Sequence, residues 1–216
     1  MKGVPSNVRV PYITARQGEE EDSFLSLRAS FGEDGKSRLG YWDEVPGDRD
    51  LHGVLWGRCS QSIGPGRLPE GLPRWKMIHP ARQRETMAML RCQVCVGPAK
   101  TDAGTLFLET ATGYRSGWPP RTAQPPVCLE HAHLAAERCP HLVRNGHVAL
   151  MVRKSPLYGV IGTPYMYGLD GVQALAGDDA PVPYGDPGLW WFLASQLVRE
   201  LRDYTVVNLD DLVPAA

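Results

Sequence analysis

Short apolar runs separated by turn residues characterise the first third of the chain. Residues 39–42 and 54–56 are rich in leucine, valine, tyrosine and tryptophan, and the polar turn Pro46-Gly47-Asp48 lies between them. This pattern predicts two strands of an antiparallel meander. The acidic run at residues 19–22 predicts a solvated loop, and the glycines and prolines of residues 60–73 predict a surface linker. We therefore expect a β-rich N-terminal segment over residues 1–73.

The middle of the chain changes to a helical pattern. Good helix formers follow Pro80 as far as residue 90, and proline is favoured in the first turn of a helix. Residues 105–108 predict a strand of a hairpin, and the glycines and prolines after it predict turns. A second helix is expected over residues 128–138, because two prolines just before it end the extended structure. These elements form the second expected segment, residues 74–145.

The C-terminal third combines extended runs with a longer apolar series. Residues 148–152 and 158–161 predict strands, and Asp186 is a favourable N-cap for a helix that begins at Pro187. Leucines then recur every four residues, as on one face of a helix: Leu189, Leu193, Leu197 and Leu201. The expected fold class is thus α+β, mainly antiparallel sheet structure with a C-terminal amphipathic helix, and residues 146–216 form a third segment packed on the rest.

Four potential metal ligands lie in two pairs near the centre of the chain. Cys92 and Cys95 have two residues between them, and Cys128 and His131 repeat that spacing further along. The spacing lets both side chains of a pair point the same way, from a tight turn or from the first turn of a helix, so the four can converge on one tetrahedral ion. Four soft ligands fill the coordination sphere of Zn²⁺. The pattern therefore predicts a structural zinc ion as cofactor.

Other ligand sets stay open at this level. His133 or Cys139 can replace His131, although an unbroken helix places Cys139 roughly 16 Å from Cys128, too far for one ion. An iron–sulfur cluster would need Cys139 as its fourth cysteine. Cys59 lies far from both pairs and precedes a glycine- and proline-rich loop, so we expect it to be an unliganded thiol.

Residues 92–139 contain C-x2-C, a predicted hairpin and C-x2-H in the first turn of a predicted helix, and they resemble treble-clef zinc motifs. The resemblance implies a central treble-clef-like zinc lobe in which a knuckle supplies the first two ligands and a helix supplies the last two. A glycine often helps the tight turn of the knuckle, and Gly97 stands one place later than is usual. More widely, several segments look like parts of uncharacterised actinobacterial proteins, a likeness that implies no activity: residues 48–56, 139–142, 182–187 and 197–203.

The charges are strongly segregated along the chain. The formal net charge of the 216 residues is −1, from 23 Lys and Arg against 24 Asp and Glu. Residues 74–154 nevertheless hold twelve basic against five acidic residues, a net charge of +7, whereas residues 155–216 hold two against eight. A basic centre open to solvent favours a polyanion, although the acidic tail can also neutralise it within the fold. We expect a zinc-stabilised, non-catalytic binding or regulatory protein that contacts nucleic acid or a protein partner, with Arg82, Arg84 and Arg91 as candidate nucleic-acid contacts.

Two further functions compete with this one. Tyr165, Tyr167 and Tyr184 stand among glycines and prolines, and a pocket lined by them would favour an enzyme, for example of specialised metabolism, with zinc as scaffold. A zinc-dependent hydrolase or nuclease is a variant of this alternative, in which an open coordination position activates water. An exposed patch at Trp190 and Trp191 would instead indicate a structural subunit of a larger assembly.

Composition and motifs exclude several other classes. The chain has no phosphate loop, dinucleotide fingerprint or serine-nucleophile elbow, and its 43% hydrophobic and 22% charged residues argue against disorder. No apolar run reaches transmembrane length, and residues 1–5 lack the apolar stretch of a signal peptide. We therefore expect a cytoplasmic protein without a membrane partner, in which paired cysteines bind metal rather than form disulfides.

Overall fold

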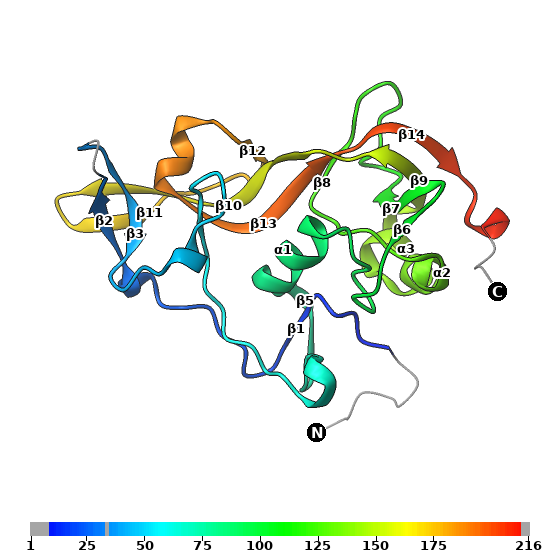
Figure 1. Ribbon diagram of the computed structural model, residues 1–216, viewed down its shortest axis with the longest axis horizontal. Helices are drawn as coiled ribbons and strands as arrows, with labels where there is room; N and C mark the ends of the chain where they lie inside the picture. The colour runs from blue at the N-terminus through cyan, green and yellow to red at the C-terminus, as the bar shows by residue number, and fades with distance from the viewer. Residues whose placement is uncertain (1–8, 33–34, 213–216) are drawn as a thin grey trace.

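Two antiparallel strands, β10 (Leu157–Gly168) and β13 (Phe192–Glu200), run along the long axis of the molecule (Figure 1). The computed structural model describes residues 9–32 and 35–212. Helices and strands both contribute to the fold, and the strands pair antiparallel except where β4 (Leu55–Trp56) joins β13. The expected α+β class with mainly antiparallel sheets is therefore confirmed.

One end of the molecule is an antiparallel sheet in the order β14-β9-β7-β6. Its strands are β6 (Lys100–Thr101), β7 (Gly104–Thr110), β9 (His147–Lys154) and β14 (Arg202–Val207). Side chains alternate between its faces. Leu106 and Leu108 pack with the helices α2 (Leu129–Arg138) and α3 (Pro140–Asn145), whereas Phe107 belongs to the core shared with the rest of the molecule. The predicted strands at residues 105–108 and 148–152 and the predicted helix at residues 128–138 are confirmed.

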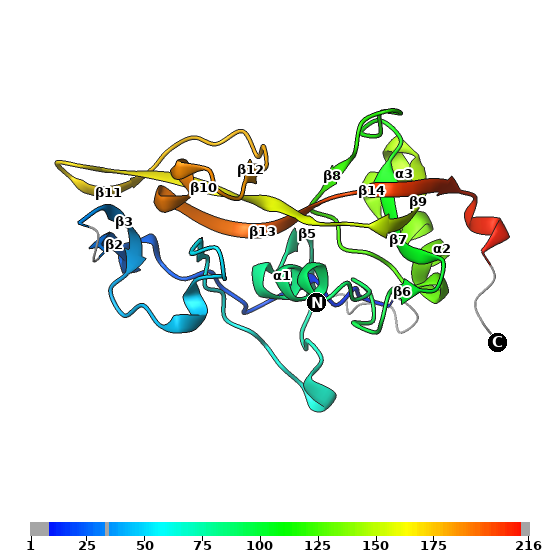
Figure 2. The ribbon, with the colours of Figure 1, turned by 45° about the horizontal axis from the view of Figure 1, so that its top comes forward.

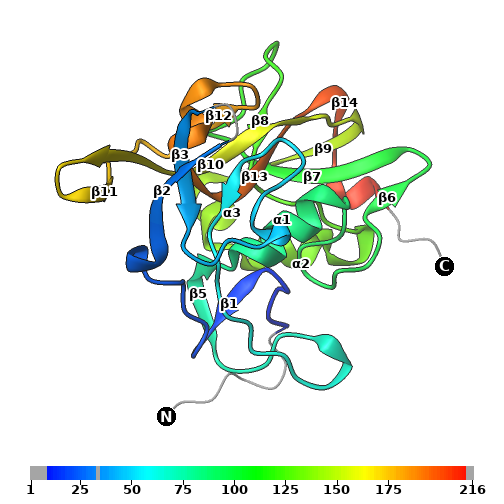
Figure 3. The ribbon, with the colours of Figure 1, turned by 60° about the vertical axis from the view of Figure 1, so that its left-hand side comes forward.

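The other end is built around β10 and β13 (Figure 2). Two short strands pair with β10, namely β11 (Gly171–Ala174) and β12 (Val182–Pro183), while β4 and β8 (Arg121–Thr122) pair with β13. The hairpin of β2 (Leu27–Phe31) and β3 (Ser37–Tyr41) closes a small core with β4. β1 (Thr14–Arg16) and β5 (Pro73–Ile78) form a separate pair (Figure 3). Short 3-10 helices connect the elements: Phe24–Ser26, Pro46–Asp48, Pro65–Arg67, Pro187–Trp191 and Leu209–Asp211.

The predicted C-terminal helix is wrong, because the segment after Asp186 forms a 3-10 turn and then β13. Asp186 does act as an N-cap, accepting a hydrogen bond from Gly188 N, but it caps only the 3-10 turn Pro187–Trp191. In β13 the extra residue Ser195 bulges from the ladder with β10, which changes the face that later side chains occupy. The main core therefore receives side chains at uneven intervals: Phe192, Ala194, Leu197 and Leu201. This interrupted alternation resembles a helical series in the sequence, and packing on both faces of the strand overrides the local preference.

Helix α1 (Pro80–Ala88) begins at the predicted proline and packs against β13. Between its neighbours β4 and β8, β13 presents the backbone of Leu197 to this helix. The Gln83 amide accepts from Leu197 N at 2.8 Å, donates to Leu197 O at 2.9 Å and donates to Ala123 O at 2.7 Å. Gln83 is fully buried. Its side chain thus takes the place of a neighbouring strand where the sheet has a gap.

Hydrogen-bonded strands cross the boundaries of the three predicted segments. The β1–β5 pair joins the first segment to the second, β4–β13 joins the first to the third, and β7–β9 joins the second to the third. Residues 60–73 form loop structure with one 3-10 turn before β5, as expected of a linker. The boundaries at residues 73 and 145 stay a prediction, but the segments share sheets.

Candidate metal centre

A tight turn positions Cys92 and Cys95. Cys92 N donates to Gly97 O and Val96 N donates to Cys92 O, each at 2.8 Å. Val96 has a φ of 57°, a left-handed conformation that strains a β-branched residue. Gly97 has a different role, since a Cβ there would lie 3.3 Å from Cys95 Sγ. The left-handed residue of the turn is therefore Val96, and Gly97 leaves room for the thiol.

The first turn of α2 positions the second pair. Cys128 is its N-cap residue and His131 is the third residue of the helix, so the two side chains project from the same end. Val127 N donates to Leu106 O at 3.0 Å, which fixes the approach to the helix against β7. The second pair is therefore positioned by β7, a strand of the sheet that begins shortly after Cys95 in the sequence.

The four side chains converge on one small volume. Their ligand atoms all lie within 4.8 Å of one another. The sulfurs of Cys95 and Cys128 are 3.9 Å apart, and Cys128 Sγ is 3.0 Å from His131 Nδ1. Two sulfurs bound to one tetrahedral ion at about 2.3 Å are roughly 3.8 Å from each other. The cluster of Cys92, Cys95, Cys128 and His131 therefore has a geometry that fits a metal ion such as zinc.

The electrostatics of the cluster also favour a cation. Burial and the adjacent cysteines raise the pKa of Cys95 and Cys128, which disfavours thiolates unless a positive charge offsets them. Burial lowers the pKa of His131, which favours the neutral imidazole that binds metals. Because His131 Nδ1 faces the sulfurs, Nε2 is left toward Glu130, whose Oε1 lies at 3.8 Å. The distance exceeds that of a hydrogen bond, so Glu130 adds negative charge near the imidazole without fixing its orientation.

The alternative ligands lie elsewhere. Cys139 ends the unbroken helix α2 and is outside the cluster, so neither its replacement of His131 nor the iron–sulfur set is supported. The His133 Nε2 atom lies 3.1 Å from Leu209 O. Cys59 is half-buried, forms a β-bridge with Glu21 and is likewise outside the cluster, as expected of an unliganded thiol.

Comparisons with known proteins assign neither a family nor a function to the chain. No protein-family model matches the chain, and neither a curated protein nor a solved structure matches it. The expected likenesses to treble-clef motifs and to actinobacterial proteins therefore gain no support from these comparisons.

The three candidate nucleic-acid contacts have different environments. Arg82 is 1% exposed, and its guanidinium forms two hydrogen bonds of 2.7 Å to the carboxylate of Glu19. Arg82 is therefore part of a buried structural ion pair, and its prediction as a nucleic-acid contact is wrong. Glu19 itself is 1% exposed, so the solvated loop expected at residues 19–22 is wrong for Glu19, whereas Glu20, Glu21 and Asp22 are exposed as expected. Arg84 is half-buried with its guanidinium 4.5 Å from the ring centre of Trp56, and Arg91 is exposed.

The three tyrosines do not line a common pocket. Tyr165 lines a cavity of about 290 Å³ between β2, β10 and β13, whereas Tyr167 is exposed with its ring 6.2 Å from that of Trp191. The Tyr184 hydroxyl donates to Asp50 Oδ2 at 2.8 Å, and its ring stacks on His52 at 3.9 Å. Only Tyr165 is therefore placed to contact a ligand in that cavity.

Trp190 and Trp191, which the sequence suggested as an exposed patch, have different environments. Trp190 is 41% exposed, and the Lys36 ammonium lies 4.7 Å from its ring centre. Trp191 is half-buried in the small core around β2 and β3.

Within the described part of the chain, none of the helices has the length and hydrophobicity needed to cross a bilayer.

A second concave site has no counterpart among the residues predicted from the sequence. Lys100, Lys154 and Arg202 line one cavity, although they are far apart along the chain. No local motif connects them. The signal available in the sequence is their charge, and the pairing of β9 with β14 is needed to bring two of them together.

Proposed function

We propose that the chain is a zinc-stabilised, non-catalytic binding protein that contacts nucleic acid through its basic centre, residues 74–154. Surface charge carries the proposal. Nine of the twelve Lys and Arg residues of this region are exposed, but only three of its five Asp and Glu residues are. Among the described residues, Arg121–Glu200 is the one Lys or Arg ion pair within 4.0 Å between this region and the acidic residues 155–216. The acidic third therefore leaves most of the basic surface open to a polyanion.

The metal has a structural role in this proposal. Three thiolates and one imidazole complete a tetrahedral zinc sphere, which leaves no position for a reactive water. The order of a tight turn, the β6–β7 hairpin and the helix α2 supports a treble-clef arrangement for residues 92–139. Zinc then ties the turn to the helix and holds the intervening hairpin, from which part of the basic surface projects.

Salt-dependent binding tests this function. The zinc-loaded protein is titrated into a labelled oligonucleotide at several salt concentrations, and fluorescence anisotropy gives the binding constant. We expect log K to fall linearly with log salt concentration, because bound counterions are released from the phosphates. Arg91→Glu should weaken binding, whereas Arg67→Glu, an exposed charge outside the basic centre, should not. The absence of salt-dependent binding by the wild-type protein would exclude the proposed function.

The cavity beside Tyr165 is the feature that favours an enzyme as the alternative function. Glu21, Asp22 and Arg58 meet Tyr165 around this cavity of about 290 Å³. Polar groups that converge beside an aromatic ring are typical of ligand pockets. Native mass spectrometry of the purified protein tests this alternative, since a co-purified small molecule that is lost on Tyr165→Ala would favour it over nucleic-acid binding.

A further inference from the structure

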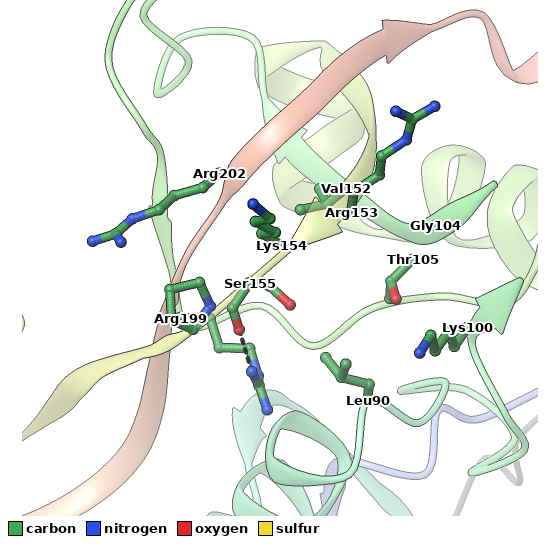
Figure 4. Close-up of a pocket in the computed structure, with 11 residues that line it drawn as sticks. Leu90, Lys100, Gly104, Thr105, Val152, Arg153, Lys154, Ser155, Arg199 and Arg202 are labelled. Carbon is green, nitrogen blue, oxygen red and sulfur yellow. Dashed lines mark hydrogen bonds between the residues drawn. The ribbon is translucent and has the colours of Figure 1, made fainter. Parts of the chain in front are cut away.

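A cavity of about 500 Å³ lies where the metal-bearing end of the molecule meets the long β10–β13 pair. It is lined by the end of β9, the β6–β7 hairpin, the loop after α1 and residues of β13 and β14 (Figure 4). The cationic lining residues are five: Lys100, Arg153, Lys154, Arg199 and Arg202. No Asp or Glu lines the cavity. The site is therefore concave and carries charge of a single sign.

Arg199 places a buried positive charge at this cavity without a carboxylate partner. It is 9% exposed. Its guanidinium donates to Met87 O at 2.8 Å, to Ala88 O at 3.0 Å and to Ser155 O. These carbonyls engage three of the five guanidinium N–H groups, and no carboxylate of the described residues lies within 4.0 Å. Buried charges in proteins are normally paired, and the carbonyls offset this one only in part, so the cavity offers an anion a cation without a carboxylate partner.

Two more cations face each other across the β9–β14 ladder. Lys154 is the direct partner of Arg202, and like charges in this relation destabilise a sheet. One carboxylate, that of Glu200, is shared between Arg202 and Arg121. Lys154 has no acidic partner within 4.0 Å among the residues that the structure describes. Glu200 therefore offsets part of the charge of Arg202, and Lys154 adds a positive charge that no described carboxylate offsets within this distance.

Lys100 completes the cation set from the opposite wall. It lies in β6 and pairs with Thr105, while Lys154 and Arg202 project from β9 and β14 (Figure 4). No aromatic side chain lines the cavity, so stacking on nucleobases has no platform there. The lining suits phosphate groups and offers no contact that would read a base.

We propose that this cavity binds the phosphodiester backbone of a nucleic-acid strand, with Lys100, Lys154 and Arg202 as its phosphate contacts and Arg199 as the buried charge behind them. The proposal rests on the proposed function and names its site. Binding at this site is independent of base sequence, because phosphates position a strand but carry no sequence information. Free polyphosphate offers the same chemistry, and the experiment has to separate the two sources.

The test uses the full-length, zinc-loaded protein. The double variant Lys100→Gln/Lys154→Gln removes two cavity charges, and Arg138→Gln/Arg144→Gln removes two exposed charges of α2 and α3 outside the cavity. Binding of a labelled oligothymidylate is measured by anisotropy over a range of salt concentrations. Each lost single-strand phosphate contact lowers the slope of log K against log salt by about 0.7. We expect the cavity variant to bind at least about tenfold more weakly with a slope lower by about 1.4, and the control variant to stay within about twofold of wild type.

A second probe separates the site from the function. Tripolyphosphate should raise the melting temperature of the wild-type protein and leave that of the cavity variant unchanged. A response to tripolyphosphate without oligothymidylate binding would sustain an anion site but refute both its nucleic-acid ligand and the proposed function. If both variants lose the same affinity for oligothymidylate, or if the cavity variant keeps wild-type affinity, the cavity is not the binding site, although the proposed function stands. Zinc content and melting temperature, measured for both variants, test whether each variant keeps the fold.

Discussion

Gln83 is the side chain whose removal tests the architecture most sharply. Its amide supplies one acceptor and two donors to backbone groups of Leu197 and Ala123 at the gap in the sheet beside β13. Gln83→Ala leaves Leu197 N without its acceptor and two carbonyls without their donors, at a site that water does not reach. We therefore expect a large loss of stability from the truncation of this neutral side chain.

The magnitude follows from the orphaned groups. A buried polar group that loses its partner costs about 1–3 kcal/mol, and Leu197 alone presents two of them. Relaxation around the truncated side chain recovers part of this cost, so we expect the free energy of unfolding to fall by about 3–5 kcal/mol. Gln83→Met keeps most of the volume but offers no hydrogen bond, and it should lose nearly as much.

Urea denaturation followed by circular dichroism measures these values on the zinc-loaded protein. Gln173→Ala, a change at an exposed glutamine of β11, is the matched control and should alter stability by less than about 0.5 kcal/mol. If the free energies of unfolding of Gln83→Ala and Gln83→Met both lie within about 0.5 kcal/mol of the wild-type value, the side chain of Gln83 does not substitute for a neighbouring strand.

Three further changes test separate parts of the structure. Arg82→Ala should cost about 3–5 kcal/mol, because it leaves the buried Glu19 carboxylate unpaired; urea unfolding should show a smaller loss for the double change with Glu19→Gln, and an equal or greater loss would contradict a structural ion pair. Burial raises the pKa of Glu109 to about 7, so its folded pKa exceeds its unfolded one and ionisation costs stability as the pH rises from about 4.5 to above 7. At pH 8 the Glu109→Gln variant should therefore be more stable than wild type by about 1–3 kcal/mol and melt at a higher temperature. At pH 4 the two proteins should be equally stable, and a difference that does not change with pH would show that ionisation of Glu109 is not its cause. Val96→Gly should stabilise the zinc-loaded protein by about 1 kcal/mol, since glycine accepts the φ of 57° without strain, and a lower melting temperature would contradict strain at this position.

Local patterns predicted the elements whose signals are contained in a few neighbouring residues. The start of α1 at Pro80, the helix after Pro125-Pro126 and the strand at residues 105–108 all appear where proline rules and apolar runs place them. The segment after Asp186 failed because its periodicity is set by a bulge at Ser195. A bulge depends on the partner strand, so an apolar series that looks helical cannot reveal it.

The candidate site shows the same division between local and long-range information. C-x2-C and C-x2-H fix four ligand types and two local geometries, and the cluster in the structure consists of those four residues. Burial is a long-range property, and it separates Arg82 in an internal ion pair from the exposed Arg91. The cavity lined by Lys100, Lys154 and Arg202 likewise exists only once β6, β9 and β14 have paired.

The measurement closest to the central claim is metal binding by single-cysteine variants. Zinc content by plasma emission, and the absorption spectrum after replacement by Co²⁺, are compared for wild type, Cys128→Ser and Cys139→Ser. We expect one zinc ion per chain and the spectrum of tetrahedral thiolate ligation in wild type and Cys139→Ser, with weakened metal binding and a lower melting temperature in Cys128→Ser. A wild-type protein without zinc, whose melting temperature a chelator leaves unchanged, would contradict a fold stabilised by the Cys92, Cys95, Cys128 and His131 cluster.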